Sequence, residues 1–164
     1  MRIRHAVAAL AAILAAGCTG SKSPTSATTQ TIGDFHGQFN GTYSIASCTA
    51  DGAFAGFCEA SGFTGAASLP ISLSLTQTSG SVSGNVTLGS VSGTFQGSVS
   101  GSTLTGSASF ADVSELGVTV TTSITSWNTT ITGDSQSGGF MLTFRMAGTS
   151  GASTLTARIT QLSR

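Results

Sequence analysis

The chain has very few charged residues. Only 7% of its 164 residues are Asp, Glu, Lys or Arg, against about 25% in an average globular protein. Six basic residues balance six acidic ones, which argues against a nucleic-acid-binding protein, because such a protein carries a basic stripe. Disorder is disfavoured as well, since 39% of the residues are hydrophobic and disordered segments are poor in such residues.

Side chains that support catalysis or metal binding are also scarce. The chain has two histidines, of which only His36 lies beyond the N-terminal segment. A serine hydrolase needs a base held beside its nucleophile, and no such set stands out among 27 serines. Solvent exposure explains the carboxylates Asp51, Glu59, Asp112 and Glu115 best, and no Cys-x-x-Cys spacing occurs. We therefore expect no enzyme, no cofactor and no metal site.

The N-terminal segment has the organisation of an export signal. Two arginines precede an apolar run over residues 6–16, which is too short to span a bilayer, since that takes about 20 residues. The run leads into Leu-Ala-Ala-Gly-Cys at residues 14–18, which resembles the lipobox of bacterial lipoproteins. The resemblance implies a signal peptide over residues 1–17 and acylation of Cys18 with lipid such as palmitate. The alternative is an ordinary secretory signal cleaved nearby.

Residues 18–34 are rich in Ser and Thr, have no apolar period and are typical of a flexible spacer. Together with the anchor, the spacer would hold a domain over residues 35–164 close to a membrane, which is the expected partner. In Gram-negative lipoproteins an Asp after the acylated Cys favours the inner membrane. Thr19 occupies that position here, so the resemblance favours the outer membrane, on its periplasmic or its surface side.

Two cysteines remain once Cys18 is assigned to the lipid. Cys48 and Cys58 lie ten residues apart, with Gly52 and Gly56 between them to let the chain turn back. The oxidising cell envelope favours a disulfide, and closing so short a loop stabilises the folded chain by about 2–3 kcal/mol. Metal binding is the less favoured alternative because the chain offers so few further ligands.

Serine, threonine and glycine are abundant instead, with 27, 26 and 22 residues. Apolar residues alternate with these small polar ones, at a period of two, over residues 71–76, 118–125, 140–147 and 154–160. This pattern is typical of strands with one buried and one solvated face. The part of the chain that follows the spacer is therefore predicted to be all-β.

A recurrent Val-Ser-Gly at residues 82–84, 91–93 and 99–101 is explained by hairpins better than by a solenoid. A two-residue turn at Gly89-Ser90 pairs residues 88 and 91. Each glycine then faces a larger residue, as sheets require of interior glycines: Gly84 faces Phe95, Gly93 faces Val86 and Gly97 faces Val82. A second turn is expected at residues 100–102.

Strands are expected over residues 39–47, 69–78, 81–88, 91–99, 102–110, 117–125, 128–133, 139–147 and 153–162. This is an antiparallel meander of about eight strands. The stretch between Glu59 and Asp112 has no charge to protect an open edge, so we predict a closed or nearly closed barrel, with a β-sandwich as the alternative. An integral outer-membrane barrel is disfavoured, since such barrels commonly end in an aromatic residue.

One short motif is similar to a known signature. Gly41-Thr42-Tyr43 at the start of the first predicted strand resembles the Gly-x-Trp that opens lipocalins and avidins, with Tyr in place of Trp. The resemblance covers three residues and implies a barrel of that general size. It carries over no binding residue.

Five of the nine phenylalanines lie around the cysteine pair: Phe35, Phe39, Phe54, Phe57 and Phe63. Either the loop plugs one end of the barrel and extends its core, or it forms an apolar lid over a cavity for a small hydrophobic ligand. In the second case the candidate ligand-binding residues are Phe54, Phe57, Phe63 and Trp127. The sequence thus predicts a non-catalytic binding module, or alternatively a structural or surface lipoprotein with a solid core that contacts other proteins.

Overall fold

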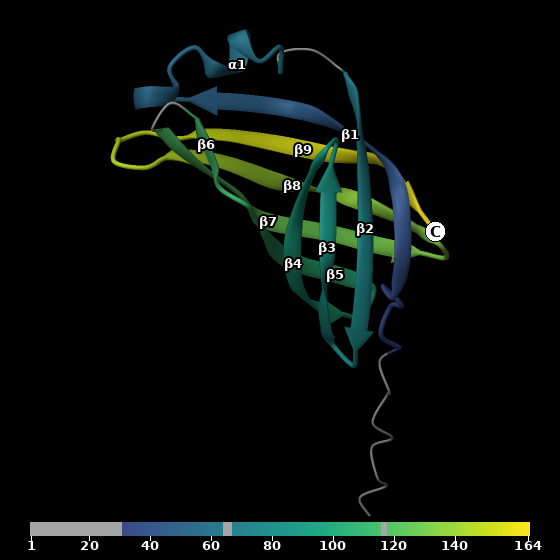
Figure 1. Ribbon diagram of the computed structural model, residues 1–164. Helices are drawn as coiled ribbons and strands as arrows, with labels where there is room; N and C mark the ends of the chain where they lie inside the picture. Colours follow the sequence, from purple (N-terminus) through teal and green to yellow (C-terminus); the bar gives the residue numbers. More distant parts are fainter. Residues whose placement is uncertain (1–30, 64–66, 116–117) are drawn as a thin grey trace, which may run out of the picture.

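The computed structural model describes residues 31–63, 67–115 and 118–164, and in this part the chain forms one antiparallel nine-stranded sheet (Figure 1). The predicted signal peptide, the acylation of Cys18 and most of the predicted spacer lie outside these residues. The strands are β1 (Gly37–Ala50), β2 (Ser68–Thr78), β3 (Ser81–Leu88), β4 (Val91–Ser100), β5 (Thr103–Phe110), β6 (Val113–Glu115), β7 (Val118–Thr132), β8 (Ser135–Met146) and β9 (Ser153–Ser163).

Eight of the strands close into a barrel. The sheet runs in the order β5-β4-β3-β2-β1-β9-β8-β7-β6, and β5 also pairs with β7. That last pairing joins the two halves, so β6 is the one strand outside the ring. The predicted all-β meander and its closure are confirmed, and the sandwich alternative is not found.

The hairpin predicted from the Val-Ser-Gly repeat has the expected register. Leu88 pairs with Val91, and Gly84, Gly93 and Gly97 pair with Phe95, Val86 and Val82. Gly89 takes a φ of 61° at the first position of the turn, as this turn type requires. Gly106 pairs with Gly97 across the next two strands. A Cβ on Gly106 would lie 2.6 Å from the Phe95 ring, so the space inside the barrel requires a glycine there.

One pair of predicted strands proved to be a single strand. Residues 118–125 and 128–132 of these two predicted strands both belong to β7, whose register against β8 shifts between Ile124 and Ser126. The bulge adds one residue to β7, so the residues that follow it point to the opposite faces from those that simple alternation predicts. Ile124 and Trp127 are therefore both buried although they lie three residues apart. β6 was not predicted, because three residues are too few to show a period.

Aromatic rings fill the middle of the barrel. Trp127 is stacked on Phe140, with ring centroids 5.3 Å apart and planes 10° apart, and its other contact is an edge-on pair with Phe95 at 5.5 Å. The indole N–H donates to Thr129 Oγ1 at 3.0 Å, and this hydroxyl donates to Gln136 Oε1 at 3.1 Å. The chain of hydrogen bonds allows polar groups to be buried among apolar ones.

One end of the barrel is closed by the segment that precedes β1. Gly33 N–H donates to Gly101 O in the β4–β5 turn at 2.7 Å, and Phe35 N–H donates to Gln77 Oε1 at 2.7 Å. The Phe35 side chain is completely buried. The hydrophobic core therefore continues to this end, although residues 31–34 fall within the predicted spacer.

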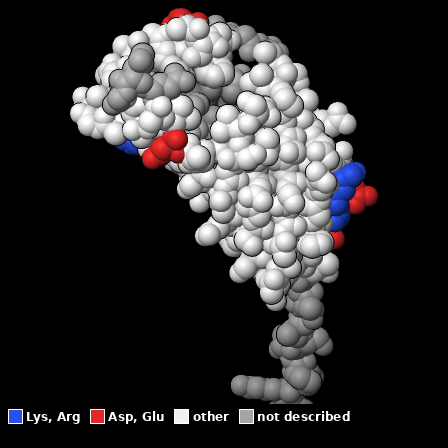
Figure 2. All heavy atoms as spheres, in the orientation of Figure 1, with Lys and Arg blue, Asp and Glu red and all other residues white. Residues whose placement is uncertain are grey.

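Charged residues are few on the folded molecule too. Figure 2 shows a face that is almost entirely uncharged, with small groups of charged side chains at its edges. The described salt bridges are both made by Arg164, to Asp34 at 2.8 Å and to Asp134 at 3.0 Å. The guanidinium also lies 5.3 Å from the centre of the Phe39 ring, so this arginine ties the segment before β1 to the β7–β8 turn.

Candidate functional site

The other end of the barrel is covered by the loop between β1 and β2. In Figure 1 this loop, with the short helix α1 (Phe57–Ala60), lies above the strands. A 3₁₀ turn at Gly52–Phe54 precedes the helix. Asp51 binds the backbone of Ala152 twice, accepting its N–H on Oδ1 at 2.8 Å and donating to its carbonyl at 3.1 Å. The loop is thereby fastened to the start of β9.

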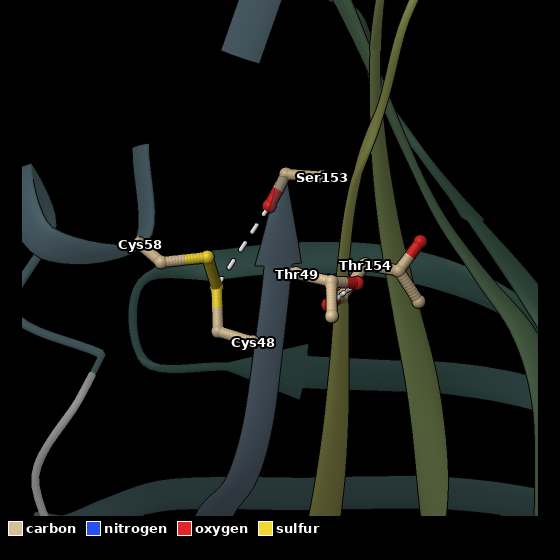
Figure 3. The surroundings of a disulfide bond; sticks show 5 residues. All are labelled: Cys48, Thr49, Cys58, Ser153 and Thr154. Atoms are coloured by element: carbon tan, nitrogen blue, oxygen red, sulfur yellow. Dashed lines mark hydrogen bonds between the residues drawn. A yellow bond between two sulfur atoms is a disulfide. The ribbon is translucent and has the colours of Figure 1, made fainter. Parts of the chain in front are cut away.

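The predicted disulfide is present in this loop. Cys48 and Cys58 are bonded, with their Cα atoms 5.8 Å apart, so that α1 is held against the end of β1 (Figure 3). Ser153 in β9 is fully buried, and its Oγ lies 3.9 Å from Cys48 Sγ. The disulfide therefore attaches the loop, through its short helix α1, covalently to β1.

Phe57 is the centre of an aromatic cluster. Its ring centroid lies 5.5 Å from that of Phe54, 5.9 Å from that of Phe63 and 5.3 Å from that of Phe144 on β8. Such separations are those of favourable aromatic pairs. The cluster therefore links the loop to the wall of the barrel by contacts that involve no hydrogen bond.

An apolar cavity of about 420 Å³ lies under the loop, within the range of roughly 300–1,000 Å³ that is usual for small-molecule sites. Its walls are residues of the loop and of the strands that surround it: Tyr43, Phe54, Phe57, Phe63, Leu88, Val91, Phe110, Ala111, Val113, Val120, Thr122, Leu142 and Phe144. The barrel is thus solid around Trp127 and hollow at this end.

The electrostatics of the cavity are simple. No charged side chain is among the described residues that line it, and its polar side chains are Tyr43 and Thr122. Tyr43 is 6% exposed, and burial raises the pKa of its phenol above the ordinary value. Its ring is held against Phe140, with centroids 5.2 Å apart. The cavity therefore offers hydroxyl groups in an apolar surrounding.

The mouth of the cavity is unusually apolar for a protein surface. Val91 and Val113 line the cavity and are 47% and 52% exposed. A second, outer groove of about 370 Å³ runs between the loop and the strands β7 and β8, and it shares Phe54, Phe57 and Val120 with the cavity. The loop is therefore a thin partition between an inner and an outer apolar space.

The structure brings together three of the four predicted ligand-binding residues. Phe54, Phe57 and Phe63 line the cavity, whereas Trp127 does not: it is 1% exposed and belongs to the packed centre of the barrel. The sequence reasoning missed Tyr43, Phe110 and Phe144. Phe110 ends a predicted strand, but Tyr43 and Phe144 lie inside theirs, and which of these side chains meet the loop depends on barrel closure.

Another hollow, of about 480 Å³, lies on the outer face of β7, β8 and β9. Its lining is mixed and includes Asn128, Met141 and the charged side chain of Arg158. The hollow is shallower than the cavity under the loop, and a shallow site buries less of a ligand, so the cavity under the loop is the stronger candidate site.

Within residues 31–63, 67–115 and 118–164, no group of three or more His, Cys, Asp or Glu side chains is arranged to hold a metal ion. No helix in the same residues is long and apolar enough to cross a membrane. No protein-family model, curated protein or solved structure matches the chain significantly.

Proposed function

We propose that the protein binds a small apolar molecule in the cavity under the loop. The observation that carries this proposal is a cavity of about 420 Å³ with a lining of aromatic and aliphatic side chains. Burying such a ligand is favourable by roughly 25 cal/mol for each Å² of apolar surface removed from water. Among the described lining residues, the Tyr43 phenol is the only side chain that titrates, which supports a binding role over a catalytic one.

We also propose that the barrel is held in the bacterial cell envelope by lipid on Cys18, and that the outer membrane is the site of attachment. The lipobox resemblance supports the anchor. The geometry adds a consequence: the chain enters the barrel beside Gly101, at the end opposite to the cavity. An anchored barrel can thus turn its mouth, with Val91 and Val113, away from the anchoring membrane.

The binding proposal is tested with the fluorescent probe N-phenyl-1-naphthylamine, whose emission rises in apolar surroundings. We expect saturable binding of one probe per full-length chain. Val120→Trp should abolish binding, because Val120 lines the cavity and a larger side chain fills it. Thr121→Trp is the matched control, because Thr121 is exposed.

Equal binding by both variants, or no saturable binding by the wild-type protein, would refute the proposal. Native mass spectrometry of the purified protein gives an independent measurement. A bound apolar molecule of defined mass, missing from Val120→Trp, is the result expected.

The anchor is tested separately, by expressing the full-length gene in a Gram-negative host. A mature chain that begins at Cys18 and carries the mass of a lipid is expected in the outer-membrane fraction. Cys18→Ser should remove the lipid. Recovery of an unmodified wild-type chain cleaved elsewhere would leave only the secretory alternative.

A further inference from the structure

One hydroxyl of the cavity lining is open to a ligand. Tyr43 lines the cavity, and its hydroxyl takes part in no hydrogen bond among residues 31–63, 67–115 and 118–164. The residue as a whole is only 6% exposed, but its hydroxyl is not among the buried atoms that lack a partner, of which the described one is Gln136 Nε2. The Tyr43 hydroxyl is therefore accessible, and a ligand with an oxygen or nitrogen atom in the right place would bind it.

The backbone around Tyr43 sets the side chain firmly in position. Tyr43 pairs with Leu69 on β2 and with Ile159 on β9, so both sides of its strand are hydrogen-bonded. The register against β9 shifts between Thr42 and Tyr43, and such bulges are a common means of re-aiming a side chain beside a site. With its ring against Phe140, the phenol is pre-organised for binding.

Charge on the ligand is disfavoured by the same lining. A buried ionic group needs an opposite charge or several hydrogen bonds to replace its hydration. The described lining residues provide no charged side chain, and apart from Tyr43 their only polar side chain is that of Thr122. Thr122 is half-buried and so remains partly hydrated, which makes it the weaker partner of the two.

We propose that the ligand is an uncharged apolar molecule with a single hydroxyl or carbonyl group, and that this group forms a hydrogen bond with the Tyr43 hydroxyl. The inference rests on the proposed function and adds to it the chemical class and the orientation of the ligand. The polar group lies at Tyr43, and the apolar body contacts the phenylalanines of the loop.

Three naphthalenes of similar shape test the inference: 2-naphthol, 2-methylnaphthalene and 2-naphthoate. Their affinities for the full-length protein and for Tyr43→Phe are measured by isothermal titration calorimetry at pH 7. We expect Tyr43→Phe to lower the affinity for 2-naphthol roughly tenfold, as the loss of one buried hydrogen bond does. The affinity for 2-methylnaphthalene should change by less than about twofold. Wild-type protein should bind 2-naphthoate more than roughly tenfold less tightly than 2-naphthol.

Thr122→Val removes the other hydroxyl of the cavity with little change in shape, and it should lower the affinity for 2-naphthol less than Tyr43→Phe does. Thr121→Val is the matched control, because Thr121 is exposed and is not among the lining residues. It should change the affinity for 2-naphthol by less than about twofold. Circular dichroism spectra confirm that the variants keep the fold.

Each alternative result is decisive. If Tyr43→Phe lowers the affinities for 2-naphthol and 2-methylnaphthalene equally, Tyr43 only packs against the ligand. If Thr122→Val lowers the affinity for 2-naphthol more than Tyr43→Phe does, the hydrogen bond belongs to the Thr122 hydroxyl. Tight binding of 2-naphthoate would overturn the exclusion of charge. In all three cases binding of N-phenyl-1-naphthylamine persists, whereas its failure with the wild-type protein refutes the proposed function itself.

Discussion

At Ser79, in the turn between β2 and β3, the backbone takes a φ of 54°, in the left-handed region. It is the only residue other than glycine with a positive φ among the described residues. A side chain is strained there by about 1 kcal/mol, and glycine is not. The carbonyl of Ser79 accepts a hydrogen bond from Gln77 Nε2 at 3.1 Å, which helps to hold the turn in this conformation.

Ser79→Gly should therefore increase the free energy of unfolding by about 0.5 kcal/mol, since relief of strain exceeds the greater flexibility of glycine in the unfolded chain. Urea denaturation measures the change. Ser81→Gly, at the start of β3, is the control and should lower stability by a similar amount. A loss of stability in both variants would contradict the explanation.

The Asp34–Arg164 pair predicts a pH dependence. The hydrogen bond from Arg164 lowers the pKa of the Asp34 carboxyl, and the backbone N–H of His36 lowers it further. A lowered pKa in the folded state means that the stabilisation is fully present above the pKa of an unfolded Asp, about 4. It is lost as the pH falls through the lower, folded value.

Asp34→Asn should thus destabilise the protein slightly at pH 7 and have less effect at pH 3, where the carboxylate is being protonated. The effect is small because the side chain is largely exposed. Urea midpoints at both pH values test this. Asp112→Asn is the control, since Asp112 makes no salt bridge with the described residues. If its effect on stability depends on pH in the same way, the Asp34–Arg164 pair is not the cause of the pH dependence.

Among the elements, the loop between β1 and β2 differs most from the rest of the molecule. The strands are held by continuous ladders of backbone hydrogen bonds, whereas the loop depends on the disulfide, the contacts of Asp51 and the Phe57 cluster. Such segments open locally at low free-energy cost. Opening of this loop would join the cavity to the outer groove and admit a ligand.

Replacing Cys48 and Cys58 by serine should lower the free energy of unfolding by about 2–3 kcal/mol, because the unfolded chain regains the freedom of a ten-residue loop. The barrel should still fold, since its strand pairings do not involve the bond. Urea denaturation and circular dichroism test both statements. The wild-type protein under reducing conditions should behave in the same way, and an unchanged midpoint would contradict the prediction.

The course of β7 could be predicted only in part from the sequence. Alternation predicts a strand up to residue 125, and a bulge between Ile124 and Ser126 then moves Trp127 to the inner face. A bulge leaves no sequence signal of its own in so threonine-rich a strand. The same shift placed Trp127 in the core beside Phe140 and not at the cavity, where the sequence predicted it.

For the whole molecule, closure of the barrel depends on close approach of β1 and β9. Gly41 lies where these strands meet, pairing with Leu162 on β9 and with Ile71 on β2. A Cβ at Gly41 would collide with the carbonyl group of Gln161. The glycine of the lipocalin-like motif thus has a physical role in this barrel, independent of any ligand.

Gly41→Ala should therefore destabilise the protein by more than about 3 kcal/mol or prevent closure, because backbone atoms must move to admit the methyl group. Gly80→Ala is the control: its Cβ would lie 3.4 Å from the Val99 carbonyl oxygen, an ordinary contact, and its φ is not left-handed. Thermal unfolding followed by circular dichroism compares them. Similar melting temperatures would show that the two strands can separate without loss of the fold.

By itself, the sequence determined most of the strands, the hairpin register from Gly84 to Gly97 and the pairing of Cys48 with Cys58. These features depend on alternation, turn residues and short loops, all of which act between neighbours along the chain. Only the tertiary structure decided that β5 pairs with β7, that Trp127 is core and that Tyr43 lines a cavity. Each of these results from strands far apart in sequence meeting in a ring, where bulges and glycines set which side chains point to the same place.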